Sequence, residues 1–332
     1  ELSRRDFLKY LSASALALGL SSLELSRVER RLASAAGPPV IWLNGASCSG
    51  CSVSFMNAVN PTVDEVLLNT ISLKYHPTLM AAAGEMAVAA ATSTAQAGGH
   101  ILVIEGAIPT GQDGQYCTVW EEGGRPVTMA EATNAMAGQA EHVLAVGTCA
   151  AFGGVSSAYC GTDIQSVGSF LDRTVVNLPG CPPHPDWIIG TVARVLGGSM
   201  PALDSYGRPT LYYTSQVIHR RCPRREAEEA DYFGQRGRCL EELGCRGPIS
   251  HADCDLRLWN NGQNWCIGAN GLCIGCTEPS FPNFPLHGEV DDDDGSQDPV
   301  ECMPGPPPPA PPPGPPPSDG GDYRTFLPLI FK

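Results

Sequence analysis

Fourteen cysteines in a chain of 332 residues constrain this fold more than any other feature of the sequence. They are too many to be incidental, and they are too widely spread for a small scaffold held together by disulfides. The densest group lies in the stretch NWCIGANGLCIGC, where the thiols can form disulfides, bind a metal or remain free in the interior. Choosing among these three possibilities decides what the chain does.

Four short apolar runs are rich in Val, Ile and Leu and are nearly continuous, which is typical of the buried strands of a parallel sheet. The runs cover residues 39–44, 100–106, 142–150 and 174–179. Helix-compatible segments lie between them, for example at 78–97 and 128–140. This alternation predicts an α/β fold class, with a doubly wound parallel sheet in a first domain at residues 38–205.

A first group of cysteines lies at the ends of these runs: Cys48 and Cys51 follow the first, Cys149 ends the third and Cys181 follows the fourth. Because functional groups gather beyond the carboxyl ends of parallel strands, we expect these four thiols to converge on one edge of the sheet. A thioredoxin-like site needs only the C-x-x-C pair and leaves the other two cysteines unexplained. The first group therefore favours an iron–sulfur cluster, with zinc and redox or disulfide chemistry as the alternatives.

A second group combines one histidine with three cysteines in the stretches HRRC and CLEELGC. Its members are His219, Cys222, Cys239 and Cys245. A histidine that replaces one thiolate removes a negative charge and tends to raise the reduction potential of a cluster. A zinc ion held by three cysteines and one histidine is the rival interpretation, and the spacing alone does not exclude it.

A third group occupies the dense stretch and the residues just before it. Its members are Cys254, Cys266, Cys273 and Cys276. Four thiolates can bind a cubane cluster or a zinc ion equally well. Three such groups in succession are hard to explain as structural zinc, whereas a chain of electron carriers explains them directly. Three cysteines belong to no group and are given no role: Cys117, Cys160 and Cys302.

The N-terminal segment has the features of a twin-arginine export signal. The sequence SRRDFLK at residues 3–9 is followed by an apolar run to about residue 23 and by a small-residue cleavage pattern at 33–35. We therefore expect residues 1–35 to be a signal peptide and the mature chain to be periplasmic. Since this route carries folded proteins, it fits metal loading in the cytoplasm. The net charge of −14 argues against a nucleic-acid-binding protein.

The composition of the sequence changes at about residue 205. Residues 206–287 are rich in Cys, Gly and Arg and read as a second, loop-rich domain. Residues 288–332 contain an acidic run and a proline-rich stretch, which predicts an extended or disordered tail. No Ser/His/Asp arrangement, Walker-type phosphate loop or H-E-x-x-H zinc motif is present in the sequence.

Taken in order, several motifs identify a family. They are WLNGASCSGCSVSFMN, EGAIPTG, GTCAAFGG, PGCPPHP, CLEELGC and CIGCTEP. Together with the His219/Cys222 pair, they make the chain resemble the small subunit of nickel–iron hydrogenases from its N-terminal signal to about residue 287. Each motif is weak alone, but the ordered set is highly specific.

The resemblance implies a flavodoxin-like first domain and three iron–sulfur clusters. The first group is similar to the proximal 4Fe–4S site, the second to the distal 4Fe–4S site and the third to the medial site between them. The family relays electrons between the Ni–Fe site of a large subunit, where H2 is cleaved, and an external acceptor such as a cytochrome or an iron–sulfur subunit. This chain would then be the electron-transfer half of a heterodimer, without catalytic residues of its own and attached to a membrane only through other subunits. The alternative is an iron–sulfur subunit of a redox complex that is not a hydrogenase.

Two departures from the family pattern carry information. Many members have a proline at the position of Cys266 and hold a 3Fe–4S medial cluster, so a fourth thiolate here predicts a 4Fe–4S cluster. If Cys266 is not a ligand, the medial cluster would be 3Fe–4S. Oxygen-tolerant members carry two extra cysteines where this chain has Gly50 and Ser157, and an ordinary 4Fe–4S proximal cluster is therefore expected.

Overall fold

The structure is a computed structural model that describes Ser21 and residues 37–158 and 162–282. Nearly all of the expected signal peptide, together with Cys160, Cys302 and the proline-rich tail, lies outside these residues. Within the described part of the chain, no helix combines the length and the apolar character needed to cross a membrane.

A five-stranded parallel sheet forms the centre of the first domain, in the order β2-β1-β3-β7-β9. Its strands are β1 (Pro39–Asn44), β2 (Ser72–Tyr75), β3 (His100–Glu105), β7 (Ala140–Val146) and β9 (Val176–Leu178). Numbered along the chain, this is the order 2-1-3-4-5 of flavodoxin-like folds. The structure thus confirms the predicted fold class.

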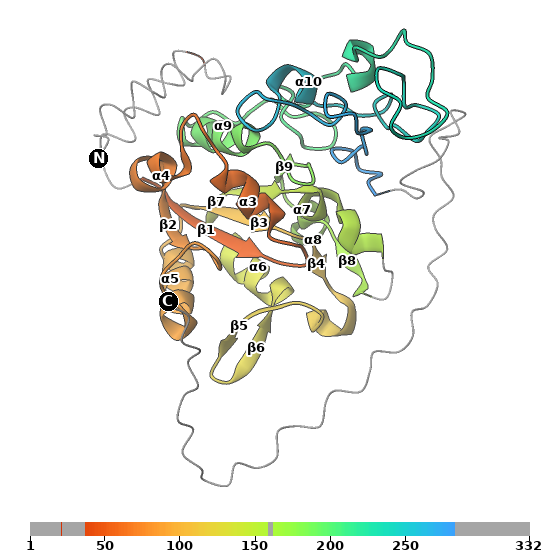
Figure 1. Ribbon diagram of the computed structural model, residues 1–332. Helices are drawn as coiled ribbons and strands as arrows, with labels where there is room; N and C mark the ends of the chain where they lie inside the picture. The colour runs from red at the N-terminus through yellow and green to blue at the C-terminus, as the bar shows by residue number, and fades with distance from the viewer. Residues whose placement is uncertain (1–20, 22–36, 159–161, 283–332) are drawn as a thin grey trace, which may run out of the picture.

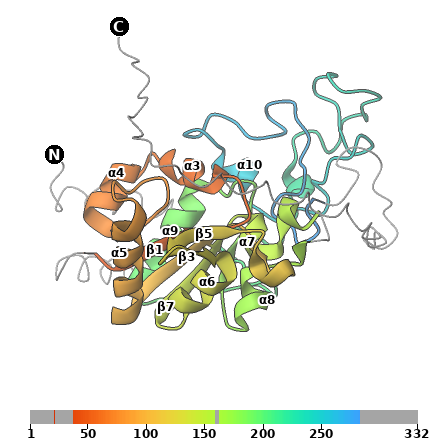
Figure 2. The same cartoon turned by 90° about the horizontal axis from the view of Figure 1, so that it is seen from below.

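Helices cover both faces of this sheet, as Figures 1 and 2 show. Val40 and Trp42 of β1 pack into one core with residues of α3 (Gly50–Met56) and α9 (Pro185–Leu196). Ile41 and Leu43 point the other way, as alternate strand residues must, and pack against α5 (Gly84–Ala97) and α6 (Met129–Ala137). Near-complete burial on both faces explains the continuous apolar runs of the sequence.

Shorter elements fill the connections. They are α4 (Val63–Glu65), η1 (Val66–Thr70), β4 (Ile108–Pro109), η2 (Gly111–Gly114), β5 (Thr118–Glu122), β6 (Arg125–Thr128), α7 (Thr148–Phe152), η3 (Gly154–Ala158), β8 (Ile164–Gln165) and α8 (Val167–Leu171). β5 and β6 form an antiparallel hairpin, and β4 also pairs with β8 in antiparallel orientation. At the start of α6, Thr128 and Glu131 form a reciprocal capping box.

The structure differs from the sequence prediction at two boundaries. The run at 142–150 was expected to be a strand, but β7 stops at Val146 because Gly147 takes a φ of 91° and the helix α7 begins at Thr148. Cys149 therefore lies on a helix rather than at the end of a strand. The helix expected from residue 78 begins only at Gly84, since residues 77–79, which start with Pro77, form a turn.

Beyond α9 the chain is almost entirely loop, with only η5 (Ile218–Arg221) and α10 (Cys254–Arg257) as named helical elements among the described residues. This part packs on the α9 side of the sheet (Figure 1). The Trp187 indole of α9 donates to Asp253 at 2.8 Å, and Arg257 makes ion pairs with Asp253 and Asp186 at 2.7 and 2.9 Å. The loop-rich part thus shares one core and a buried polar seam with the sheet.

Candidate metal centres

All twelve cysteines in the described part of the chain are unpaired thiols. The disulfide alternative is therefore wrong for these residues. Eleven of the twelve belong to the three groups expected from the sequence, and the remaining one, Cys117, is half-buried beside the core formed by α5 and α6.

The structure brings the first group together at the carboxyl edge of the sheet. Cys51 lies on α3 after β1, Cys149 on α7 after β7, and Cys181 in the loop after β9. Burial raises the pKa of the Cys51 thiol, and the nearby charges of Glu105 and the other three cysteines raise it further. Cys51 is buried, whereas Cys48 and Cys181 are exposed, so this group opens onto the molecular surface.

Glu105, the last residue of β3, holds the C-x-x-C segment in place. Its fully buried carboxylate accepts hydrogen bonds from the backbone amides of Cys51 and Ser52 at 3.0 and 3.2 Å. It also accepts from the Ser52 hydroxyl at 2.5 Å and from the Trp42 indole at 3.0 Å. These bonds satisfy free amides of the first turn of α3 and place a negative charge at its N-terminus. The position of Glu105 at the end of a buried strand was the sequence signal that could have identified this supporting role.

His76 adds a second buried group to this support. Its Nε2 lies 3.2 Å from the Ser52 hydroxyl, and its ring lies 5.1 Å from that of Trp42. Its Nδ1 accepts from the Thr78 amide at 3.2 Å. Burial lowers the pKa of His76 to about 4, so the folded protein keeps this ring neutral.

The titration of His76 predicts a loss of stability in mild acid. In the unfolded chain His76 takes up a proton below its ordinary pKa of about 6.5. In the folded chain it stays neutral until the pH falls to about 4. The free energy of unfolding should therefore fall by about 2 kcal/mol from this group between about pH 7 and pH 5. Replacing His76 with Gln should remove that share of the pH dependence in denaturant titrations. Equal pH slopes for the two proteins would contradict the assignment.

The four members of the second group line one small cavity. His219 lies on η5, and its Nδ1 is 3.3 Å from a carboxylate oxygen of Glu241. Carboxylates commonly orient histidines that bind metals. Burial raises the pKa of the Cys245 thiol, and the charges of Cys222 and Cys239 add to that effect.

The third group is also assembled. Burial raises the pKa of the Cys254 thiol well above its usual range, and the neighbouring charges, which include Cys276, Cys273 and Cys266, raise it further. Cys266 is the exposed member of this group. Among the described residues, no three His, Cys, Asp or Glu groups lie close enough together to hold a single metal ion.

A buried ion pair anchors the end of the third group. Arg208 donates to Glu278, two residues after Cys276, at 3.0 Å, and to Asp204 at 2.7 Å. Glu278 also accepts from the backbone amide of His251 at 2.6 Å. Both Arg208 and Glu278 are almost fully buried, so the segment after Cys276 is tied to the loop that follows α9.

Backbone amides point at sulfur atoms in the first and second groups. The Gly50 amide donates to Cys48 at 3.3 Å, the Arg224 amide to Cys222 at 3.4 Å, and the Cys273 amide to Cys245 at 3.4 Å. Amides aimed at thiolates are typical of iron–sulfur sites, where they stabilise the negative charge. Gly147 leaves space that a side chain would fill, since a Cβ there would lie 2.5 Å from the Cys51 sulfur. The donor sets and their surroundings therefore fit iron–sulfur clusters.

Comparison with known proteins divides the chain into two matched regions. Residues 48–195 match the family model described as NADH ubiquinone oxidoreductase, 20 Kd subunit. Residues 213–286, which contain the second and third groups, match the model for the C-terminal part of the NiFe/NiFeSe hydrogenase small subunit. The second match is the informative one, because the first describes a protein of another redox complex.

Full-length relatives agree with that second match. The chain is 43% identical over 307 residues to the periplasmic [NiFeSe] hydrogenase small subunit of Desulfomicrobium baculatum, covering 85% of this chain and 96% of that protein. It is 38% identical over 290 residues to the periplasmic [NiFe] hydrogenase small subunit of Solidesulfovibrio fructosivorans, covering 84% and 90%. The chain belongs to the nickel–iron hydrogenase small-subunit family.

Solved structures of hydrogenases have the same fold. A chain of the H2-activated [NiFeSe] hydrogenase of Dm. baculatum superposes with a TM-score of 0.72 at 43% identity, covering 77% of this chain and all of that one. An actinobacterial-type NiFe hydrogenase chain from Ralstonia eutropha H16 gives 0.71 at 28% identity, covering 78% and 84%. The resemblance drawn from the sequence motifs is confirmed, and this hydrogenase small subunit is part of an oxidoreductase.

Proposed function

We propose that this protein relays electrons between the Ni–Fe site of a hydrogenase large subunit and an external acceptor through three iron–sulfur clusters. The catalysed reaction is the reversible cleavage of H2 into two protons and two electrons, carried out in the large subunit. The observation that supports this role is the assembly of three four-membered donor groups whose neighbours touch. The hydroxyl of Thr148, next to Cys149 of the first group, donates to the Cys276 carbonyl of the third, and the Cys273 amide of the third group donates to the Cys245 sulfur of the second.

Each group would hold one 4Fe–4S cluster. The proximal site would use Cys48, Cys51, Cys149 and Cys181; the distal site His219, Cys222, Cys239 and Cys245; and the medial site Cys254, Cys266, Cys273 and Cys276. When bound, such clusters supply one-electron carriers at potentials that depend on ligand type, burial and hydrogen bonds to sulfur. The position of Cys266 beside the other three thiols supports a medial 4Fe–4S rather than a 3Fe–4S cluster.

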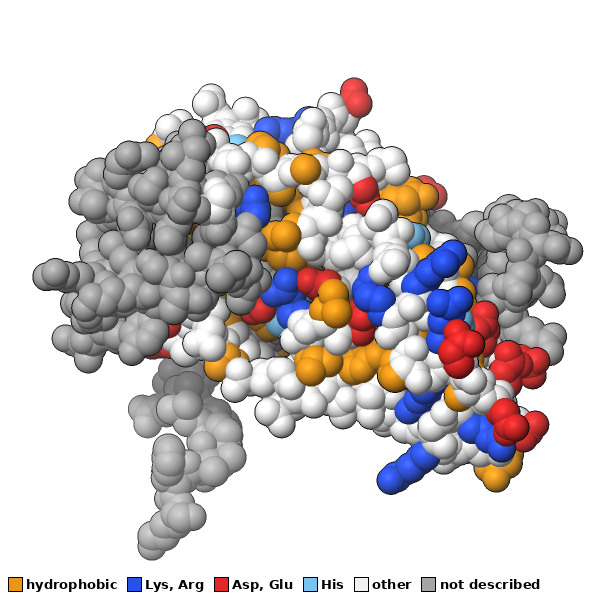
Figure 3. All heavy atoms as spheres, turned by 90° about the horizontal axis from the view of Figure 1, so that it is seen from above, with side chains coloured by type: hydrophobic (Ala, Val, Ile, Leu, Met, Phe, Trp, Pro, Cys, Tyr) orange, Lys and Arg blue, Asp and Glu red, His pale blue; other side chains and the backbone are white. Residues whose placement is uncertain are grey.

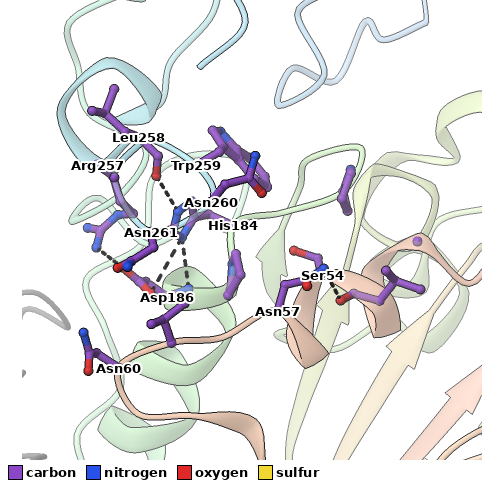
Figure 4. A pocket seen from close by; sticks show the side chains of 16 residues that line it. Ser54, Asn57, Asn60, His184, Asp186, Arg257, Leu258, Trp259, Asn260 and Asn261 are labelled. Atoms are coloured by element: carbon purple, nitrogen blue, oxygen red, sulfur yellow. Dashed lines mark hydrogen bonds and ion pairs between the residues drawn. The ribbon is translucent and has the colours of Figure 1, made fainter. Parts of the chain in front are cut away.

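The large subunit would dock on the surface around Cys48 and Cys181. Both thiols are exposed there, together with the apolar side chains of Val53 and Met56 on α3. A hollow of about 580 Å³ beside α3 adds a concave feature to this surface. Asp186 lies between His184 and Arg257 on one wall of the hollow, and Ser54 and Asn57 of α3 face it from the other (Figure 4).

The external acceptor, a cytochrome or another iron–sulfur subunit, would dock near the distal group. Arg220 and Arg225 are exposed next to His219 and Cys222, and the exposed aromatic rings of Tyr232 and Phe233 lie on the following loop. Figure 3 shows basic and acidic side chains intermingled on this side of the molecule. Such a surface suits a transient, orienting contact.

A periplasmic location is proposed from the twin-arginine pattern and from the relatives, two of which are named as periplasmic subunits. On this interpretation the chain is exported folded, as one half of a heterodimer, and reaches a membrane only through other subunits. The first domain would run over residues 38–205 and the second over 206–287. The expected signal peptide and tail complete the proposed organisation.

Elemental analysis tests the central proposal. Besides the iron of the Ni–Fe site, the purified heterodimer should contain roughly twelve iron and twelve acid-labile sulfide per small subunit, as three cubane clusters require. It should also contain nickel in the partner chain. A colourless, sulfide-free protein would refute the electron-relay role, and a cluster-bearing complex without nickel would favour the non-hydrogenase alternative.

A further inference from the structure

Thr148 is a buried side chain that touches the loops of two cysteine groups at once. It lies at the start of α7, next to Cys149 of the first group, and is 2% exposed. Its hydroxyl accepts a hydrogen bond from the Gly180 amide at 2.8 Å, just before Cys181. The same hydroxyl donates to the backbone carbonyl of Cys276 in the third group. One hydroxyl therefore joins three ligand-bearing segments that are far apart in the sequence.

The backbone around Thr148 makes this junction rigid. The Thr148 amide donates to the Gly180 carbonyl at 3.1 Å, and the Gly147 amide donates to Leu178 at 2.9 Å. These bonds hold the loop after β7 against the loop after β9. Of the hydrogen bonds described at this junction, only the one from the Thr148 hydroxyl reaches the Cys276 carbonyl. The third group is therefore attached to these two loops through a side chain.

The link between the third and second groups is of a different kind. The Cys273 amide donates to the Cys245 sulfur at 3.4 Å, and the Arg246 amide donates to the Cys273 carbonyl at 2.7 Å, so the ligand residues themselves take part in both bonds. The first and third groups are instead joined through the hydroxyl of Thr148, which is not a ligand. A substitution at Thr148 can therefore alter their contact without removing a donor from either group.

We propose that Thr148 is a positioning residue that holds the Cys276 segment of the third group against the Cys149 and Cys181 segments of the first, and so controls electron exchange between these two groups. This inference rests on the proposed electron-relay function. Loss of the hydroxyl frees the Cys276 carbonyl and leaves the Gly180 amide buried without its acceptor. The Cys276 segment then shifts away from the segments that carry Cys149 and Cys181. Orientation by such outer contacts is a general feature of metal sites.

The test compares three variants of the intact heterodimer. Thr148→Val removes the hydroxyl but keeps the shape of the side chain, and Thr148→Ser restores the hydroxyl. Thr191→Val is the matched control, because Thr191 on α9 is equally buried and its hydroxyl has no hydrogen-bond partner among the described residues. Each protein is analysed for iron and sulfide and then followed by electron paramagnetic resonance during a redox titration.

We expect Thr148→Val to shift the reduction potential of the third-group cluster, to weaken its magnetic interaction with the first-group cluster and to slow electron exchange between them severalfold. Thr148→Ser and Thr191→Val should behave like the parent. Loss of iron confined to the first and third groups would also support the role. Unchanged potentials and interaction in Thr148→Val, or equal loss of iron from all three groups, would overturn it. A parent protein without cluster signals would instead refute the proposed function itself.

Discussion

Replacement of Arg208 with methionine should lower the free energy of unfolding by about 3–5 kcal/mol, because it leaves the buried Glu278 carboxylate without its cation. Arg208 is 3% exposed and Glu278 is 6% exposed, so water cannot substitute for the missing partner. Methionine keeps most of the apolar volume of the arginine stem beside the rings of Tyr206 and Tyr213. The cost therefore reports the lost charge pair more than a cavity. Denaturant titration of parent and variant measures it.

The chain provides a matched control for this experiment. Arg125 makes an ion pair with Glu131 at a similar distance, 2.8 Å, but both side chains are exposed. Arg125→Met should therefore change the free energy of unfolding by less than about 1 kcal/mol. Similar costs for the two substitutions would mean that burial does not govern the Arg208 pair. A loss of third-group iron in Arg208→Met alone would be consistent with its anchoring of the segment after Cys276.

Replacement of Cys266 with proline should convert the third-group cluster from 4Fe–4S to 3Fe–4S. The variant removes the fourth thiolate, so the iron that it would bind has no protein ligand. Electron paramagnetic resonance of the oxidised heterodimer should then show a strong 3Fe–4S signal that the parent lacks, and the potential of this cluster should rise. Loss of a negatively charged ligand favours the reduced form, which explains the direction.

Two further variants isolate the cause. Cys266→Ala removes the thiol without the backbone restriction of proline and should give the same new signal. Cys117→Ser alters a half-buried thiol outside the three groups and should leave the spectrum unchanged. A stoichiometric 3Fe–4S signal in the parent protein would show that Cys266 is not a ligand.

Sequence patterns predicted the buried strands well and the exposed ones poorly. The runs at 39–44 and 100–106 match β1 and β3 closely, because both faces of these strands are covered and nearly every position is apolar or buried. β2 was missed because it is a short edge strand, SLKY, whose partial exposure leaves no continuous run. The end of β7 was misplaced because Ala150 and its neighbours are as apolar in a helix as in a strand.

The order and spacing of the cysteines predict three groups, but the contacts between the groups could not be predicted from the sequence. Thr148 and Cys276 are brought together by the packing of the loop-rich domain on the sheet, and no local pattern encodes that contact. The role of Glu105 was hidden for a related reason, since its partners Trp42 and Ser52 lie on a different strand and helix. Local periodicity reports which face a residue occupies, whereas a polar network depends on the completed fold.

The parallel sheet has a consequence for how the protein is made. The thiols of the first group come from the segments that follow β1, β7 and β9, three strands that lie at wide intervals along the chain. They can meet only after the last of these strands has joined its neighbour. A nascent or partly unfolded polypeptide therefore cannot hold an iron–sulfur cluster at that edge of the sheet. Retention of iron there would serve as a checkpoint of maturation, because uptake of the metal and completion of the sheet are thermodynamically linked.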